Sequence, residues 1–208
     1  QNNYGKRPVN WLIDNVNVDS RWCLVHSTHM HPEEIDKLAK SGAVAGLCPV
    51  TEANLGDGIF NGSKYISSGG KYGIGTDSNV SISLTDELRM LEYMQRLYNK
   101  ERNVMKNSSR SVGESLYTSA LIGGNQALSR NSGIIASGQW ADLLTLDSDA
   151  LAFFGSSEDE ILDRWIFSAN DLLVCEVWSA GRQVVVEGHH IKHEQIEKRY
   201  RNIIRQLY

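Results

Sequence analysis

Three short apolar segments alternate with helical segments over the first 130 residues, and this alternation restricts the possible folds more than any other feature. The apolar segments, each expected to be a strand, are 22–26, 43–50 and 71–78. Each is followed by residues with the spacing or end signals of a helix. Successive strand–helix units of this kind form parallel strands with right-handed crossovers. The sequence therefore predicts an α/β fold with a parallel sheet.

The expected helices have end signals. Pro32, followed by two acidic residues, is expected to begin a helix, because proline needs no N–H partner there and acids suit the positive end of the helix dipole. Gly42 is expected to end that helix. Ser83 or Thr85 is expected to cap a long amphipathic helix. A capping-box sequence opens a further helix over about 111–130.

The pattern changes after residue 131. Residues 132–149 and 172–188 have the character of strands, with a turn near 181–182. A short helix is expected over 157–169 and a polar helix over 193–208. The chain is thus expected to have three regions, namely residues 1–130, 131–188 and 189–208.

Charge and composition exclude several classes of protein. The net charge is −4 and there is no basic block, so neither nucleic acid nor a membrane surface is an expected partner. No apolar run is long enough to span a bilayer, and the first residues lack the apolar core of a signal peptide. Three scattered cysteines without CxxC spacing fit buried thiols in the reducing cytoplasm.

Two of the expected strands end in residues that can do chemistry. His26 ends the first strand and Asp77 ends the third. In a parallel α/β barrel, the side chains at the carboxyl ends of the strands face the active site. A carboxylate can bind zinc and accept a proton from water, and a nearby imidazole can stabilise the transition state. The alternative is a helix-capping aspartate and a hydrogen-bonded core histidine.

Longer stretches of sequence resemble a known family. Four segments are similar to the C-terminal half of the amidohydrolase superfamily, and most similar to its formimidoylglutamate deiminase branch in histidine degradation. These segments are CLVHSTHM, GAVAGLCPVTEANLGDGIF, GIGTDSNVSIS and GIIASGQWADLLTLD. The resemblance spans residues 7–208. It implies the C-terminal part of a metal-dependent (β/α)8 TIM barrel, followed by part of a small β-sandwich domain.

The resemblance also implies roles. Asp77 would bind the one zinc ion (Zn²⁺) of the active site and act as the base, and His26 would lie beside that metal and contact the substrate or the attacking water. The implied reaction is hydrolysis of the C=N bond of N-formimino-L-glutamate to N-formyl-L-glutamate and ammonia. Glu52 and Asn54 are candidates for substrate contact, because the loop expected at 51–62 borders the pocket.

Other polar residues are expected to be structural. His29 and His31 lie in a loop and at a helix start, and Asp142 is expected to make a turn contact. The remaining histidines lie in a polar stretch expected to be solvated, and they are His189, His190 and His193.

The family pattern is incomplete in this segment. The family's HxH motif and a further metal-binding histidine are expected upstream of this segment. These 208 residues alone should therefore bind zinc weakly and be inactive. They should also associate, either with a second copy as a homo-oligomer or with the remaining half of the enzyme. Asn79 stands where relatives carry a histidine, which leaves the exact substrate open. The alternatives are another zinc amidohydrolase, such as a ring deaminase or an imidazolonepropionase-like enzyme, and a non-catalytic amidohydrolase-like subunit. A nucleotide- or sugar-binding domain is disfavoured because no phosphate-binding glycine motif is present.

Overall fold

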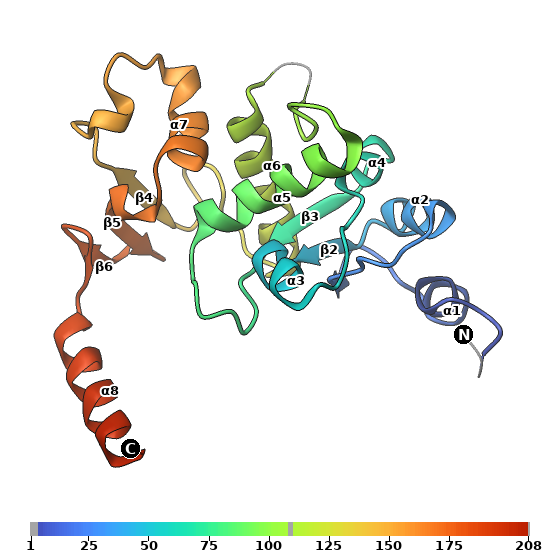
Figure 1. Cartoon of the computed structure of the whole chain (residues 1–208), viewed down its shortest axis with the longest axis horizontal. Helices are drawn as coiled ribbons and strands as arrows, with labels where there is room; N and C mark the ends of the chain where they lie inside the picture. Colours follow the sequence, from blue (N-terminus) through green and yellow to red (C-terminus); the bar gives the residue numbers. More distant parts are fainter. Residues whose placement is uncertain (1–3, 108–109, 208) are drawn as a thin grey trace.

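The computed structural model describes residues 4–107 and 110–207 (Figure 1). Its first sheet has three strands, β1 (Cys23–Val25), β2 (Val44–Leu47) and β3 (Lys71–Ile74), in the order β1-β2-β3. Both pairings are parallel. The parallel sheet predicted from the alternating segments is therefore confirmed.

Helices join these strands and cover the sheet. The connection from β1 to β2 contains α2 (Pro32–Ser41), and the connection from β2 to β3 contains α3 (Pro49–Leu55) and α4 (Gly62–Ser67). His31 is the N-cap residue of α2, and Gly42, with a φ of +78°, ends it as expected. A further helix, α1 (Pro8–Asn15), precedes β1 and packs beside α2.

Two long helices follow the third strand. They are α5 (Leu84–Asn99), which is capped by the hydroxyl of Ser83, and α6 (Val112–Ala127). Helix α6 lies so close to β3 that a Cβ built on Gly123 would be 1.9 Å from the carbonyl oxygen of Tyr72. Glycine at this position therefore permits the contact between helix and sheet.

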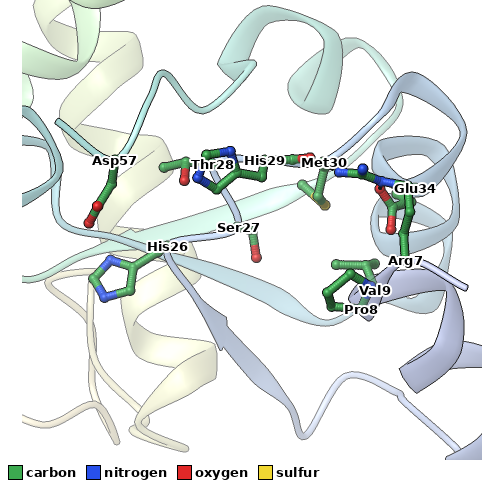
Figure 2. Close-up of a pocket in the computed structure, with 10 residues that line it drawn as sticks. All are labelled: Arg7, Pro8, Val9, His26, Ser27, Thr28, His29, Met30, Glu34 and Asp57. Atoms are coloured by element: carbon green, nitrogen blue, oxygen red, sulfur yellow. Dashed lines mark hydrogen bonds and ion pairs between the residues drawn. The ribbon is translucent and has the colours of Figure 1, made fainter. Parts of the chain in front are cut away.

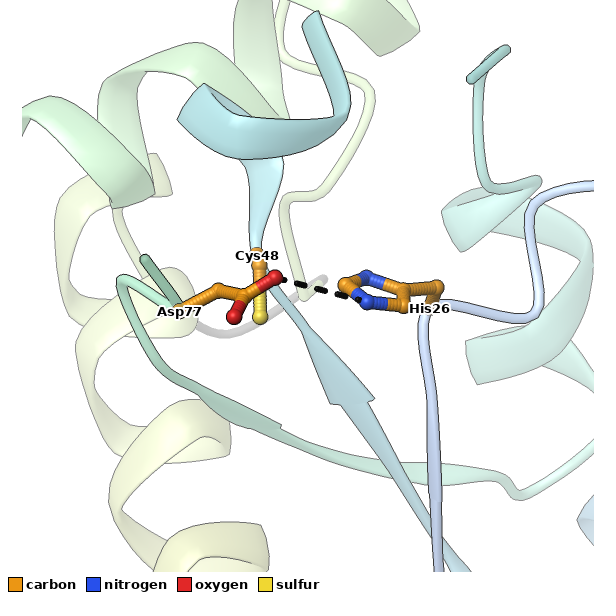
Figure 3. A group of neighbouring side chains, drawn as sticks. All are labelled: His26, Cys48 and Asp77. Atoms are coloured by element: carbon orange, nitrogen blue, oxygen red, sulfur yellow. Dashed lines mark ion pairs between the residues drawn. The ribbon is translucent and has the colours of Figure 1, made fainter. Parts of the chain in front are cut away.

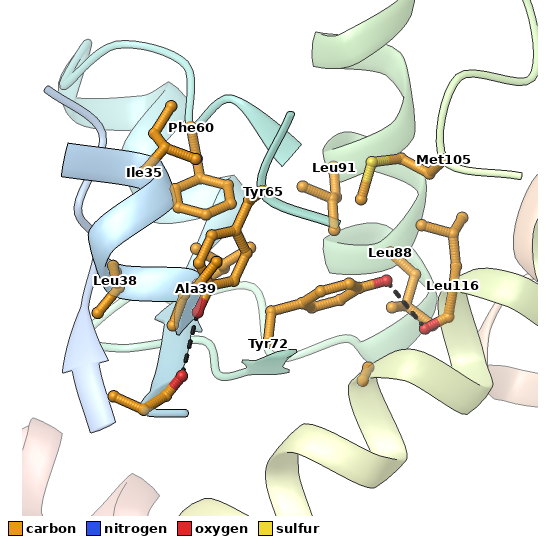
Figure 4. Packing of buried hydrophobic residues seen from close by; sticks show 14 of the residues in the cluster. Ile35, Leu38, Ala39, Phe60, Tyr65, Tyr72, Leu88, Leu91, Met105 and Leu116 are labelled. Atoms are coloured by element: carbon orange, nitrogen blue, oxygen red, sulfur yellow. Dashed lines mark hydrogen bonds between the residues drawn. The ribbon is translucent and has the colours of Figure 1, made fainter. Parts of the chain in front are cut away.

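The main core lies between the sheet and its helices (Figure 4). Tyr65 and Tyr72 are buried there, and each places its hydroxyl on a backbone carbonyl oxygen, that of Ala43 at 3.1 Å and that of Leu116 at 3.3 Å. These hydrogen bonds satisfy the polar end of each ring, which makes burial of the large aromatic surface favourable.

A second, four-stranded antiparallel sheet follows. Its strands, in the order in which they pair, are β4 (Leu143–Leu146), β5 (Val174–Ser179), β6 (Arg182–Val186) and β7 (His189–His190). Between β4 and β5 lie η1 (Leu151–Phe153), η2 (Glu158–Glu160), α7 (Ile161–Ser168) and η3 (Asp171–Leu173). Helix α7 packs on α5 and α6, and its Ile166 belongs to the main core. The region boundaries at residues 130 and 188 stay a prediction.

The last helix, α8 (His193–Leu207), projects away from the rest of the molecule (Figure 1). None of its residues is buried. No helix among the described residues combines the length and the apolar character needed to cross a membrane.

Several expectations were wrong in detail. Strand β3 ends at Ile74 rather than at 78, and β4 occupies only 143–146 of the expected 132–149. Residues 51–55 belong to α3 rather than to a loop, because Pro49 occupies the first helical turn, where its missing N–H costs nothing. Strand β2 accordingly ends at Leu47. Cys23, expected to be buried, is exposed, because it shares with Val25 a face of the edge strand β1 that the described residues leave uncovered.

Candidate active site at the carboxyl ends of the parallel strands

His26 and Asp77 lie side by side, directly beyond the carboxyl ends of β1 and β3. The Nε2 atom of His26 is 3.6 Å from the Oδ2 atom of Asp77. Their side chains are 37% and 41% exposed, so a small molecule can reach both. Parallel strands place their ends at one edge of the sheet, which explains how residues so far apart in the sequence meet. Their catalytic roles stay predictions.

The backbone at these two positions is strained. His26, Ser27 and Asp77 have φ values of +65°, +53° and +53°, in the left-handed region that side chains other than glycine seldom occupy. The His26 N–H donates to the carbonyl oxygen of Gly46 at 2.7 Å, which holds the strained turn against β2. Such conformations persist where the surrounding structure enforces them, and they are concentrated at functional sites.

Cys48, at the end of β2, is the third member of this cluster (Figure 3). One atom from each of His26, Cys48 and Asp77 lies within 4.8 Å of the others. Burial, reinforced by the charges of nearby carboxylates, raises the pKa of the Cys48 thiol to about 11. Sequence reasoning treated Cys48 as a structural thiol, although its place directly after a strand is the same signal that identified His26 and Asp77.

Glu52 lies beneath His26 on the first turn of α3. Its Oε1 atom is 3.2 Å from Nδ1 of His26 and accepts a hydrogen bond from the backbone N–H of Cys48 at 2.9 Å. The side chain is only 1% exposed, and burial raises its pKa above the ordinary value. Its Oε2 atom is buried without a hydrogen-bond partner. Asn54, two residues further along α3, is exposed and does not share the helix face of Glu52.

A second buried carboxyl group, that of Glu87 on α5, contacts the first turn of α3. Its Oε2 atom accepts a hydrogen bond from the backbone N–H of Val50 at 2.8 Å. Burial raises the pKa of Glu87 to about 7, and the charge of Glu52 adds to the effect. Sequence reasoning missed Glu87, because an acidic residue in the first turn of a long helix is normally explained by the helix dipole alone.

A cavity of about 300 Å³ opens beside His26 (Figure 2). His26, Ser27, His29 and Asp57 line the part nearest the strand ends. At its other end the Nε of Arg7 donates to Glu34 at 2.7 Å, so the charge of this guanidinium is already balanced.

The remaining singled-out residues have structural contacts. Asp142 accepts hydrogen bonds from Nη2 of Arg130 at 2.7 Å and from the backbone N–H of Ala180 at 2.8 Å, as the predicted turn contact requires. Asn79 accepts the Ser81 N–H at 2.8 Å and so stabilises the turn after β3. The histidines expected to be solvated are exposed, namely His189, His190 and His193.

The donor atoms at the strand ends fit a metal ion such as zinc. Imidazole nitrogen, thiolate sulfur and carboxylate oxygen are the three kinds of protein atom that bind zinc. Because the pKa of Cys48 is raised, His26 and Asp77 are the readier donors near neutral pH. Among the described residues, His26, Cys48 and Asp77 form the cluster of side chains that could hold such an ion.

The chain is similar to known hydrolytic enzymes. It is 47% identical to a formimidoylglutamate deiminase of Pseudomonas aeruginosa over 204 residues, which are 98% of this chain and 45% of that protein. An amidohydrolase from Brucella melitensis has a crystal structure that superposes with a TM-score of 0.92 at 46% identity, covering 98% of this chain and 45% of its own.

A more distant structure shares the fold. A zinc-bound adenosine deaminase from Xanthomonas campestris has a TM-score of 0.83 at 24% identity, covering 99% of this chain and 47% of its own. The chain thus spans a little under half the length of these proteins. The sequence model of the family described as "Amidohydrolase family" matches residues 12–184, which is most of the chain. The chain therefore belongs to the amidohydrolase family.

Proposed function

We propose that this chain forms part of an enzyme that hydrolyses the C=N bond of N-formimino-L-glutamate in histidine degradation, giving N-formyl-L-glutamate and ammonia. The observation that carries the proposal is the 3.6 Å approach of His26 Nε2 and Asp77 Oδ2 at the open ends of the strands. The 47% identity to a protein named formimidoylglutamate deiminase supports this choice of substrate.

Asp77 is proposed to bind a zinc ion and to move the proton. A bound zinc ion would lower the pKa of a water molecule and so supply a nucleophile near neutral pH. The carboxylate of Asp77 accepts a proton from the attacking water and passes it to the nitrogen that leaves as ammonia. His26 hydrogen-bonds the amidine group or the water and stabilises the charge that develops on the amidine carbon's substituents.

Contact between the substrate and Glu52 or Asn54 stays a prediction. Asn54 is exposed on α3 and accessible to a ligand, whereas Glu52 is buried. The cavity beside His26 supports a small-molecule substrate, because its volume of about 300 Å³ lies at the lower end of the range for ligand pockets.

We further propose that the chain self-associates and that it acts in the cytoplasm. Helix α8 carries an exposed apolar stripe at coiled-coil spacing, formed by Ile196, Tyr200, Ile203 and Leu207. A stripe of this spacing is the surface by which two helices pair, here from two copies of the chain. The three cysteines are unpaired, as in proteins of a reducing compartment.

Ammonia release tests the proposed reaction. The enzyme expressed from its complete coding frame is assayed with formiminoglutamate and, for comparison, with 5-methylthioadenosine, because a deaminase of that nucleoside from Pyrococcus abyssi is 28% identical. Asp77→Asn and His26→Ala should each lower kcat/KM roughly 100-fold or more, since each removes a group used in the transition state.

Matched substitutions on the surface control for folding. Asp149→Asn and His189→Ala change exposed residues far from the strand ends and should leave the rate unchanged. Release of ammonia from the nucleoside alone would redirect the proposal to another aminohydrolase, and the lack of turnover with either substrate would favour a non-catalytic subunit.

A further inference from the structure

The contacts of Glu52 determine the direction of its hydrogen bond with His26. The Oε1 atom of Glu52 already accepts the backbone N–H of Cys48 at 2.9 Å. The same atom lies 3.2 Å from Nδ1 of His26. A backbone N–H can only donate, so Oε1 is the accepting oxygen of this carboxyl group, and a proton carried by the group would sit on Oε2. The Nδ1 atom of His26 must therefore be the donor.

We propose that Glu52 is a positioning residue that holds His26 in the Nδ1–H tautomer, with the lone pair of Nε2 directed to the site. Glu52 suits this task because it is 1% exposed and is fixed to the start of α3 through the Cys48 N–H. The pattern is that of a carboxylate behind a histidine, which fixes the tautomer and orientation of the ring. In this role Glu52 acts through His26.

The tautomer determines what the site can bind. With the proton on Nδ1, Nε2 is an acceptor, and it faces Oδ2 of Asp77, also an acceptor, at 3.6 Å. Two acceptors that converge in this way need an electropositive partner, either a metal ion or a molecule that donates hydrogen bonds to both. A water molecule and the N–H groups of an amidine meet the second description. This consequence rests on the proposed function, whereas the tautomer itself does not.

The tautomer is directly measurable. The 208-residue chain, labelled with ¹⁵N in its histidines, gives separate long-range ¹H–¹⁵N correlations for its six imidazole rings. At about pH 8, above the ordinary histidine pKa of about 6.5, a neutral ring shows one protonated and one bare nitrogen at well-separated shifts. His26→Asn assigns the His26 signals by their loss. We expect Nδ1 protonated and Nε2 bare, and the reverse pattern in the unsubstituted protein would overturn the proposal.

Two substitutions separate positioning from simple structural support. Glu52→Gln keeps an oxygen for the Cys48 N–H, so it should retain the Nδ1–H pattern. Glu52→Ala removes the acceptor, and the His26 signals should shift toward the Nε2–H tautomer that free histidine prefers. Unchanged His26 signals in Glu52→Ala would contradict the proposal. If Glu52→Ala does not fold, the unsubstituted protein and Glu52→Gln still decide the matter.

A second buried glutamate provides the matched control. Glu92 is likewise unexposed and accepts backbone N–H groups, those of Val104 at 3.1 Å and Met105 at 2.9 Å, but it lies on α5 and makes its ion pair with Arg96. Glu92→Ala should therefore destabilise the fold without moving the His26 signals.

The activity measurement distinguishes this inference from the proposed function. In the complete enzyme, Glu52→Ala should lower kcat roughly 10- to 100-fold with a smaller change in KM, and Glu52→Gln should restore most of the rate. If the enzyme has no deiminase activity but the Nδ1–H tautomer is found, the positioning role stands and the proposed function fails. If the enzyme is active with His26 in the other tautomer, the positioning role alone fails.

Discussion

The carboxyl group of Glu87 accepts a hydrogen bond from the backbone N–H of Val50 at 2.8 Å, and so ties α5 to the first turn of α3. That turn also carries Cys48 as its N-cap residue and Glu52. A buried acidic group thus supports the helix start from which the candidate site is built.

Glu87 should make the stability of the fold depend on pH. Its pKa is about 7 in the folded chain and near 4.5 when unfolded, so the folded state holds more protons between these values. Stability should therefore fall as pH rises from about 4.5 to 7, by up to about 2 kcal/mol. Glu87→Gln cannot ionise and should lack this part of the slope. The free energy of unfolding, measured with urea at pH 5 and at pH 8, tests this expectation. An equal change with pH in the two proteins would count against the assignment.

Asp142 should show the opposite pH dependence. Its hydrogen bonds from Arg130, followed by that from Ala180, lower its pKa to about 2 from the ordinary 3.8. Its stabilising contribution is therefore complete above about pH 4 and is lost as pH falls toward 2. Asp142→Asn should cost about 1 kcal/mol at pH 7, since the group is partly exposed. The stabilities of the two proteins should approach each other in acid, and a difference at pH 2 as large as at pH 7 would show another cause.

The contact between α6 and β3 should be intolerant of a single methyl group. A Cβ on Gly123 would lie 1.9 Å from the carbonyl oxygen of Tyr72, so Gly123→Ala should destabilise the fold by about 3 kcal/mol or more. The adjacent Gly124 is its control, because a Cβ there has nothing within 4 Å. Gly124→Ala should stabilise α6 by up to about 1 kcal/mol through helix propensity. Thermal unfolding should therefore shift in opposite directions, and similar shifts would disprove the close contact.

The cysteines should differ in reactivity. Cys23 is exposed on the edge strand, although partial burial of its thiol raises its pKa, whereas Cys48 is buried and its pKa is about 11. A thiol-reactive disulfide at pH 8 should modify Cys23 rapidly and Cys48 only on unfolding, because the thiolate is the reacting form. Cys23→Ser should remove the fast phase. Rapid labelling that survives in this variant and disappears in Cys48→Ser would show that Cys48 is accessible.

Association through α8 should depend on its apolar stripe. Ile203→Asp places a charge in the middle of the stripe and should reduce the mass measured by light scattering to that of one chain. Asn202→Asp adds the same charge at the adjacent position outside the stripe and serves as the control. A monomer in the unsubstituted protein would overturn the proposed pairing.

Local sequence pattern was sufficient for much of this protein. The alternation of apolar and helical segments, with caps such as Ser83 and a stop such as Gly42, determined the parallel sheet and most of its helices, because these signals act over a few neighbouring residues. The rule that parallel strands end at one edge was enough to expect His26 and Asp77 together. Family resemblance added the proposed chemistry.

Tertiary structure alone decided how the site is supported. Cys48 joins His26 and Asp77, and Glu52 lies beneath His26 with Glu87 behind the same helix start, because packing between α3, α5 and the strand ends brings together groups distant along the chain. Single-sequence patterns record which face of an element is apolar, but not which partner that face meets. Burial then sets the protonation of the carboxyl groups, since the cost of a charge depends on the surroundings that the whole fold supplies.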